Sequence, residues 1–370
     1  MSAPLAGLKV IELARILAGP WIGQTLSDLG ADVIKIESPE GDDTRKWGPP
    51  FVDHEGDRSA AYFHCTNRGK TSRVVDFKNE VQLGELRELI ADADILIENF
   101  KVGGLRKFGL DFETLHELNP RLIYCSVTGF GQDGPYSHRA GYDFLIQGMS
   151  GIMDLTGDPN GEPQKIGVAF ADIFSGLYGV IGIQAALADR AKTGIGQQVD
   201  ISLLDCMTGV LANQAMNFLA SGKSPARLGN AHPNIVPYQT FAVSDGRIIV
   251  ACGNDRQFQA LCQTLKLSEI SDNPDFSSNP KRVENRDALT KVLSVAFEAW
   301  TKQDILTALE IAVVPAGPIN TVEEALSDPQ IKHRAMQIAP EGVPGLRTPI
   351  SFSRSRLSLG NASPALPKSL

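Results

Sequence analysis

A single carboxylate lies inside a strongly apolar stretch near the middle of the sequence. The stretch runs from residue 166 to 188, and Asp172 is its one charged residue. Moving a carboxylate out of water is costly unless a ligand, a reaction or a local donor compensates. Asp is a favoured N-cap, so the pattern predicts a helix that Asp172 caps and that ends near Ala191. A reactive carboxylate also fits, because a helix N-terminus keeps it ionised and directs N–H groups toward a bound anion.

The same stretch is long enough to cross a membrane. We interpret it as a helix of a soluble fold, because it contains Asp172 and is rich in glycine, and because no second span supports it. The first residues, MSAPLAGLKVIEL, contain neither a basic region before an apolar core nor an Arg- and Ser-rich presequence. We therefore expect a cytoplasmic protein.

Length, charge and composition narrow the class of protein. A chain of 370 residues is too long for one compact core and predicts two domains. The net charge of −8 argues against a general nucleic-acid or anionic-membrane binder, but it allows a local basic pocket. Five scattered cysteines and six histidines lack the spacing of a disulfide framework or a metal site. No G-x-S-x-G motif supports a serine hydrolase.

The N-terminal third must position these residues, and it has the pattern of a parallel sheet. Residues 8–13 predict a buried strand, 20–29 an amphipathic helix and 33–37 a second strand, which together form a βαβ unit. The dinucleotide fingerprint is absent from the first turn, residues 14–19. The one G-x-G-x-x-G, at 129–134, follows a predicted strand but precedes no periodic helix, so we interpret it as a loop that needs positive φ.

Two basic clusters flank further predicted strands. Residues 67–78 (NRGKTSRVVDFK) surround one short strand, and residues 99–109 (NFKVGGLRKFG) follow a strand at 95–98. Solvated surface is the ordinary explanation for any one of these cations. Two such clusters beside strand ends of an acidic protein favour a polyphosphate ligand at the carboxyl edge of the sheet.

The second half of the chain predicts a smaller unit. A strand at 199–203 and an apolar helix that ends near residue 221 complete the first unit. A linker follows at 221–237, then a hairpin at 238–251 and two or three helices up to about residue 311. Residues 340–370 are rich in Pro and Ser and predict extended chain.

The chain resembles the class III coenzyme A transferases over almost its whole length. The segments that carry the resemblance are LAGLKVIELARILAGPWIGQTLSDLGADVIKIESPEGDDTRKWGPP, NRGKTSRVVDFK, ENFKVGGLRKFGLDFETLHELNPRLIYCSVTGFGQDGPY, RAGYDF, GVAFADIFSGLYG, KTGIGQQVDISLLD and HPNIVPYQTFAVSDGRIIVACGNDRQF. The resemblance implies an α/β fold, in which a Rossmann-like large domain with a parallel sheet is joined to a smaller α+β domain. It also implies an interlocked homodimer. The implied boundaries are 1–224 for the large domain, 225–325 for the small domain, and 326–370 for the return to the large domain.

The resemblance also assigns roles to residues. It implies that Asp172 is the catalytic nucleophile, that Asp143 lies close to the reacting centre, and that Gly253 and Asn254 belong to a loop covering the site. It implies coenzyme A contacts from Ile16, Leu17, Ala18, Val75, Asp76, Phe77, Lys78, Asn99, Phe100, Lys107, Arg139 and Tyr142. Coenzyme A enters as a substrate, and neither a tightly bound cofactor nor a metal ion is expected.

Several positions depart from related enzymes. Ser38 and Lys107 stand where formyl-CoA transferases have arginines, and the covering loop, residues 251–255, lacks their poly-glycine run. The α-methylacyl-CoA racemases, which share this fold, use a His where this chain has Tyr142. A racemase with Tyr142 lacks half of its proton-transfer machinery.

The resemblance is strongest to enzymes that move coenzyme A from succinyl-CoA to a small dicarboxylic acid. It implies a reaction through an aspartyl anhydride and an aspartyl-CoA thioester, in which covalent catalysis divides one difficult transfer into easier steps. A second carboxylate needs a cation, and Arg15, Arg45 or Arg139 could supply it. Two alternatives remain open: a racemase-type epimerase of the same fold, and a non-catalytic acyl-CoA-binding protein.

Overall fold

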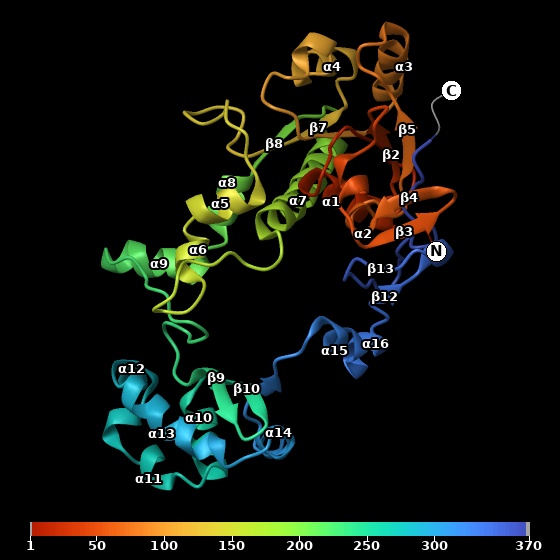
Figure 1. The fold of residues 1–370 in the computed structure, drawn as a ribbon. Coiled ribbons are helices and arrows are strands. Elements are labelled where there is room, and N and C mark those ends of the chain that lie inside the picture. The colour runs from red at the N-terminus through yellow and green to blue at the C-terminus, as the bar shows by residue number, and fades with distance from the viewer. Residues whose placement is uncertain (1, 368–370) are drawn as a thin grey trace. The chain divides into compact units, whose positions relative to one another are not determined.

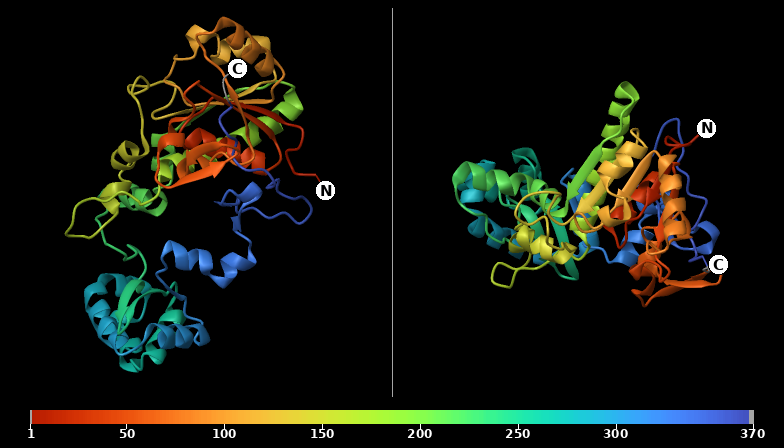
Figure 2. Two further views of the ribbon diagram at one scale, coloured as in Figure 1. Left: turned by 45° about the vertical axis from the view of Figure 1, so that its right-hand side comes forward. Right: turned by 90° about the horizontal axis from the view of Figure 1, so that it is seen from above.

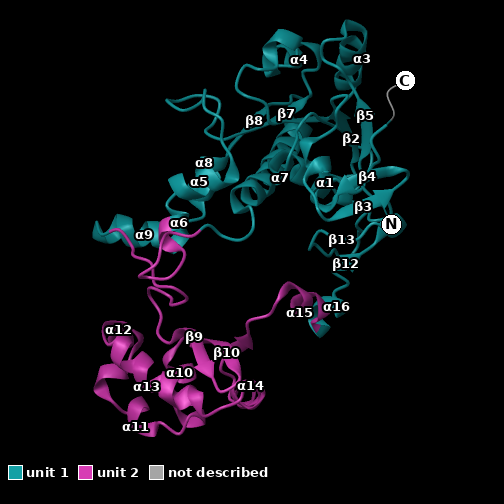
Figure 3. Ribbon diagram, viewed as in Figure 1, with its two compact units in different colours: residues 1–153, 165–223, 329–370 teal, residues 154–164, 224–328 magenta. Residues whose placement is uncertain are grey.

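The computed structural model describes residues 2–367 and divides into two compact units. The first unit contains residues 1–153, 165–223 and 329–370, and the second contains 154–164 and 224–328 (Figure 3). Each unit has its own core, so each is described by itself.

A parallel sheet of six strands forms the centre of the first unit (Figure 1). Its strand order is β5-β2-β1-β6-β7-β8, and every neighbouring pair is parallel. The strands are β1 (Lys9–Glu12), β2 (Asp32–Glu37), β5 (Thr71–Val74), β6 (Ile95–Glu98), β7 (Ile123–Thr128) and β8 (Gln198–Ser202). The predicted α/β fold with a parallel sheet is therefore confirmed, and the strands fall where the sequence pattern places them.

Helices cover both faces of this sheet (Figures 1 and 2). Alternate residues of β1 supply the two faces: Val10 packs in the core beneath α1 (Ala18–Asp28) and α7 (Phe170–Thr193). Ile11 packs on the other face, in the core beneath α3 (Glu80–Ala91) and α4 (Phe112–Leu118). A parallel sheet that is buried on both faces needs apolar side chains on both sides of its strands.

Helix α7 corrects two details of the sequence analysis. The helix begins at Phe170 and has Ala169 as its N-cap, so Asp172 lies in its first turn and does not cap it. Asp143 supplies the hydrogen-bond acceptor at this helix end instead: its carboxylate accepts from the Ala171 N–H at 2.8 Å. The single helix predicted up to residue 221 is two helices, α8 (Leu203–Gly209) and α9 (Ala212–Ser221), because Ala212 adopts a positive φ of 45°.

By length and composition, α7 is the one helix among residues 2–367 that could cross a membrane. One face of the helix packs on the sheet and on α1, through buried residues such as Gly179 and Ile183. A Cβ at Gly179 would come within 2.3 Å of the Ile22 side chain, so a larger residue there would force that side chain to shift. Near the end of α7, the buried Arg190 pairs with Asp94 at 2.8 Å.

The remaining elements of the first unit are short. They are α2 (Ala61–His64), α5 (Asp143–Met149), α16 (Pro329–His333), the hairpins β3 (Phe51–His54)–β4 (Asp57–Ala60) and β12 (Gln337–Ile338)–β13 (Gly345–Leu346), and the 3-10 turns η1 (Asp43–Lys46), η2 (Arg106–Phe108) and η4 (Pro340–Gly342). Helix α6 (Ile152–Leu155) spans the boundary between the units, which falls after Met153. The loop at 129–134 has positive φ at Gly131 (90°) and Gly134 (82°), as its glycine pattern predicts.

The second unit packs helices against a three-stranded sheet. Its strands are β9 (Tyr238–Val243), β10 (Gly246–Ala251) and β11 (Ala316–Pro318), and β9 and β10 form the predicted hairpin. The helices are α10 (Asp255–Thr264), α11 (Ser268–Ser271), α12 (Asn279–Glu284), α13 (Arg286–Glu298), α14 (Lys302–Ile311) and α15 (Val322–Ser327), with the 3-10 turn η3 (Pro274–Phe276). Five of these helices lie between residues 251 and 311, where two or three were predicted, because breaks at 265–267, 272–278, 285 and 299–301 divide the apolar pattern.

Candidate active site

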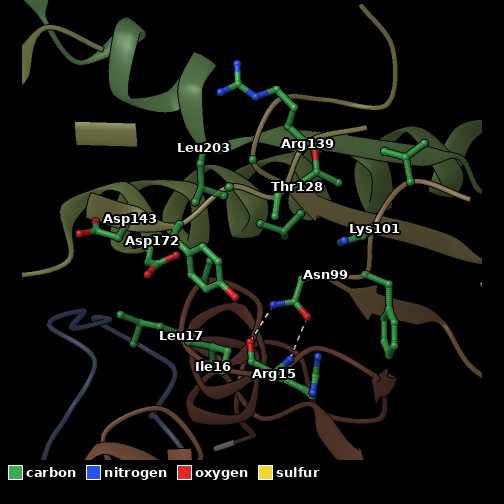
Figure 4. A pocket seen from close by; sticks show the side chains of 18 of the residues that line it. Arg15, Ile16, Leu17, Asn99, Lys101, Thr128, Arg139, Asp143, Asp172 and Leu203 are labelled. Atoms are coloured by element: carbon green, nitrogen blue, oxygen red, sulfur yellow. Dashed lines mark hydrogen bonds between the residues drawn. The ribbon is translucent and has the colours of Figure 1, made fainter. Parts of the chain in front are cut away.

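A cavity of about 470 Å³ lies in the first unit, where the chain leaves the carboxyl ends of β1, β6 and β7 (Figure 4). Ligands of open parallel sheets bind at this edge. The cavity is lined by Arg15, Ile16, Leu17, Ala18, Asn99, Phe100, Lys101, Val102, Gly104, Val127, Thr128, Gly129, Ser137, Arg139, Ala140, Gly141, Tyr142, Asp143, Asp172 and Leu203.

Asp172 and Asp143 lie next to each other on one side of the cavity (Figure 4). Asp172 is half-buried, and burial raises the pKa of its carboxyl to about 7, with a further contribution from the negative charge of Asp143. A buried carboxyl group without a cationic partner has a raised pKa, because its ionised form is less stable than that of a carboxylate in water. Such a group is a candidate nucleophile in a cleft of this kind.

Both oxygens of the Asp143 carboxylate accept hydrogen bonds from residues other than Asp172. One oxygen of Asp143 accepts from the Ala171 N–H, and the other accepts from Gln147 Nε2 at 2.8 Å. Gln147 is fully buried, and its Oε1 accepts from the Ile166 N–H at 2.9 Å. Gln147 thus connects helix α5 to the segment that leads into α7. The sequence analysis missed this residue, because its partner Ile166 is 19 residues away and no local pattern marks the pair.

Tyr62 is a second residue that the sequence analysis missed. Burial raises the pKa of its phenol to about 12, and the Asp172 carboxylate contributes to this shift. The phenol on the short helix α2 is therefore electrostatically coupled to Asp172. Its ring also packs edge-on against Trp47 at 5.2 Å between centroids. Tyr62 follows a polar segment with no periodic pattern, so no sequence signal linked it to Asp172.

Three cations line the cavity: Arg15, Lys101 and Arg139. Only Lys101 belongs to the two basic clusters of the sequence. The cluster at 67–78 does not line this cavity, because Arg68, Lys70 and Arg73 pair with Asp28, Glu12 and Glu85. Arg139 packs over the Tyr136 ring at 4.6 Å, and Arg15 lies 5.8 Å from the centroid of the Phe100 ring. Both guanidinium groups stay charged in these contacts, and Arg15 also pairs with Asp43 at 3.2 Å.

Comparison with known proteins decides the family. The model of CoA-transferase family III matches residues 5–368. The chain belongs to this family. A succinate–glutarate CoA-transferase of Agrobacterium fabrum is 53% identical over 371 residues, which cover 98% of this chain and 93% of that protein. The human succinyl-CoA:glutarate CoA-transferase is 41% identical over 98% of this chain and 83% of its own length.

Solved structures agree with the fold. A crystal structure of a CaiB/BaiF family protein from Brucella suis is 64% identical and superposes with a TM-score of 0.90, over 100% of this chain and 97% of that one. The protein is therefore an enzyme of the class III CoA-transferases, whose substrates are CoA thioesters.

The residues that the resemblance assigns to coenzyme A divide into two groups in this CoA-transferase. Seven line the cavity: Ile16, Leu17, Ala18, Asn99, Phe100, Arg139 and Tyr142. The segment 75–78 and Lys107 do not line it. They are linked to it through aromatic rings. Phe77 stacks on the cavity residue Phe100 at 6.1 Å, Phe108 packs on Phe77 at 5.3 Å, and Lys107 Nζ lies 4.7 Å from the Phe108 centroid. Contact of this second group with coenzyme A stays a prediction.

Gly253 and Asn254 belong to the second unit. The Gly253 N–H donates to Gln257 Oε1 at 2.7 Å, and the Asn254 side chain caps α10 by accepting from the Gln257 N–H. Both bonds hold the loop to its own helix. That this loop covers Asp172 stays a prediction.

Proposed function

We propose that this enzyme transfers coenzyme A from succinyl-CoA to a small dicarboxylic acid, with glutarate as the first acceptor to test. The names of the Agrobacterium and human relatives support these substrates. The observation that carries the chemistry is Asp172, a carboxylate in a cavity at the sheet edge whose pKa is raised to about 7 and which has no cation beside it in the described part of the chain.

In the proposed mechanism, an Asp172 oxygen attacks the thioester carbonyl of succinyl-CoA. The C–S bond breaks, and a mixed anhydride and the CoA thiolate are formed. The thiolate then attacks the Asp172 carbonyl carbon and releases succinate, which leaves an aspartyl-CoA thioester. A glutarate carboxylate displaces the thiolate to form a second anhydride, and the thiolate attacks its glutaryl carbonyl. Glutaryl-CoA departs and the Asp172 carboxylate is restored.

The second carboxylate of the acceptor requires a cation. Of the three candidate arginines, Arg45 does not fit this role. Arg45 is buried, and its guanidinium donates to Glu37, Asp57, Ser59 and the Pro364 carbonyl. These partners leave no free donor for a substrate. Arg15 and Arg139 line the cavity and remain as the proposed partners of the distal carboxylate.

We also propose that the enzyme is a homodimer in the cytoplasm. The support for a dimer is a set of exposed apolar side chains on the first unit: Phe144 on α5, Ile181 on α7, and Met216 and Leu219 on α9 are each at least 60% exposed. Large apolar side chains are often buried in protein interfaces. Sedimentation analysis of the purified protein tests the dimer, and cell fractionation tests the location.

The deciding experiment traps the acyl group on the enzyme. The protein is incubated with succinyl-CoA without acceptor, treated with hydroxylamine, digested and analysed by mass spectrometry. We expect a hydroxamate on Asp172 in the wild type and none in Asp172→Asn, followed by glutaryl-CoA formation when glutarate is added. Itaconate, malate and oxalate serve as parallel acceptors. Deuterium exchange at the α-carbon of a branched acyl-CoA, without an Asp172 adduct, would instead identify a racemase.

A further inference from the structure

The turn that joins β1 to α1 contains a strained residue. Ile16 lines the cavity and adopts a φ of 74°. This left-handed conformation is a clear outlier for a β-branched residue, and it persists only where the surrounding structure imposes it. Because Leu17 and Ala18 follow directly and line the same cavity, the conformation of Ile16 sets the position of this whole wall.

Asn99 holds the turn from one side. Its Oδ1 accepts from the Arg15 N–H at 2.9 Å, and its Nδ2 donates to the Arg15 carbonyl at 2.7 Å (Figure 4). Both ends of the side-chain amide are therefore bonded to the backbone of one residue. The resemblance to CoA-transferases assigns Asn99 to the ligand, but these two bonds assign its side chain to the turn.

A buried ion pair holds the turn from the other side. Lys35 is fully buried, and its ammonium group bonds to Glu12 at 3.2 Å, to Asp42 at 2.9 Å and to the Ala14 carbonyl at 2.9 Å. The same Asp42 oxygen accepts from the Ile16 N–H at 3.3 Å. The ion pair is thus bonded to backbone groups on both sides of Arg15, while the other Asp42 oxygen accepts from Thr44.

Four successive backbone groups of the turn, from the Ala14 carbonyl to the Ile16 N–H, are bonded to side chains from other segments. We infer that Lys35, Asp42 and Asn99 are positioning residues, which impose the left-handed conformation at Ile16 and thereby hold the residue 16–18 wall in the geometry that binds the thioester beside Asp172. This inference rests on the proposed function of the cavity.

The test measures kcat and KM for succinyl-CoA in Asn99→Ala, alone and combined with two changes at residue 16. Ile16→Gly and Ile16→Ala remove the same branched side chain, but glycine alone adopts positive φ without strain. We expect Asn99→Ala to lower kcat/KM about 30-fold in the wild-type background, which corresponds to the loss of two hydrogen bonds. We expect less than about a 5-fold loss in the Ile16→Gly background, and an undiminished loss in the Ile16→Ala background.

An equal loss in all three backgrounds would overturn the inference, because it would mean that Asn99 contacts the ligand directly. Unchanged kcat/KM in Asn99→Ala would also overturn it. If Asn99→Ala fails to fold, Asn99→Asp replaces it in the same three backgrounds, because the carboxylate still accepts from the Arg15 N–H but cannot donate to the carbonyl. Loss of activity in Asp172→Asn tests the function of the cavity separately, so the two failures are distinguishable.

Discussion

Two groups of sequestered carboxylates in the first unit have opposite environments. Glu37 is the last residue of β2 and pairs with Arg45. Asp42 follows this strand and pairs with Lys35. Burial alone would raise the pKa of Asp42, but the Lys35 ammonium and the Thr44 hydrogen bonds outweigh it and hold the pKa below its ordinary value. Burial would likewise raise the pKa of Glu37, and Arg45 and Lys35 reverse that shift.

Asp172 has the opposite balance. Its largest contribution is burial, the next is the like charge of Asp143, and its pKa rises to about 7. The comparison separates carboxylates that stabilise the fold from one that is available for chemistry. A saturated carboxylate has no free lone pair for a substrate, whereas Asp172 is close to balanced between its two protonation states at neutral pH.

The largest effect is expected where this reactive carboxylate is removed. Asp172→Asn keeps the shape of the side chain but replaces the nucleophilic oxygen, so we expect CoA transfer to fall by at least about 10³-fold. The measurement is the steady-state rate of glutaryl-CoA formation from succinyl-CoA. Asp92→Asn is the matched control, because Asp92 pairs with Lys9 on the exposed surface and does not line the cavity. A variant that keeps more than about a tenth of the activity would refute the nucleophile.

The second largest effect is on stability, at the saturated group. Asp42→Asn leaves Lys35 with one carboxylate fewer in a site without solvent, so we expect the free energy of unfolding to fall by about 3 kcal/mol. Urea unfolding monitored by circular dichroism measures it. Asp92→Asn is the control, because its pair with Lys9 is exposed and should leave the midpoint unchanged. Equal midpoints for both variants would mean that the buried pair adds no stability.

Local patterns predicted most of the first unit. The strands β1, β2, β6 and β7 are short segments rich in Val, Ile and Leu, and they lie where the sequence pattern predicts strands. Asp172 was found because a charge inside an apolar run is expensive. Both signals depend on neighbouring residues, which is why one sequence was enough.

What the sequence could not predict depends on contacts between distant residues. The cap of α7 was assigned to Asp172, but the acceptor is Asp143, which is 28 residues away from the donor Ala171. The hydrogen bonds that hold the turn at Ile16 join residues far apart in the sequence: Ile16 and Asp42 are separated by 26 residues, and Arg15 and Asn99 by 84. These pairs do not follow the regular spacing of residues along one helix or strand, so the periodicity of the sequence does not reveal them.

The third prediction uses the protonation state of Asp172. Only its ionised form attacks, so we expect kcat/KM to level off above pH 7 and to fall about tenfold per unit below it. Asp143→Asn removes the like charge, which should move the midpoint to lower pH. The measurement is a pH profile of kcat/KM for both proteins. A midpoint that stays the same in Asp143→Asn would show that burial alone raises the pKa.

The smallest effect expected is that Asp172→Asn stabilises the fold. The carboxyl has a raised pKa in the folded state, so the folded protein binds more protons than the unfolded chain between about pH 4 and pH 7. Wild-type stability is therefore lost, relative to the variant, as pH rises through this window. Because water reaches the carboxyl, we expect a difference of about 1 kcal/mol at pH 8 and almost none at pH 4. Urea unfolding at the two pH values measures it.

Asp42→Asn serves as the opposite case in the same measurement. Its native pKa is lowered, so its wild-type contribution is favourable above the unfolded pKa and its loss must destabilise the protein at pH 8. Two aspartates that are replaced by the same isosteric amide should thus change stability in opposite directions. If both variants lose stability at pH 8, Asp172 is itself a structural carboxylate, and the distinction between the two groups fails.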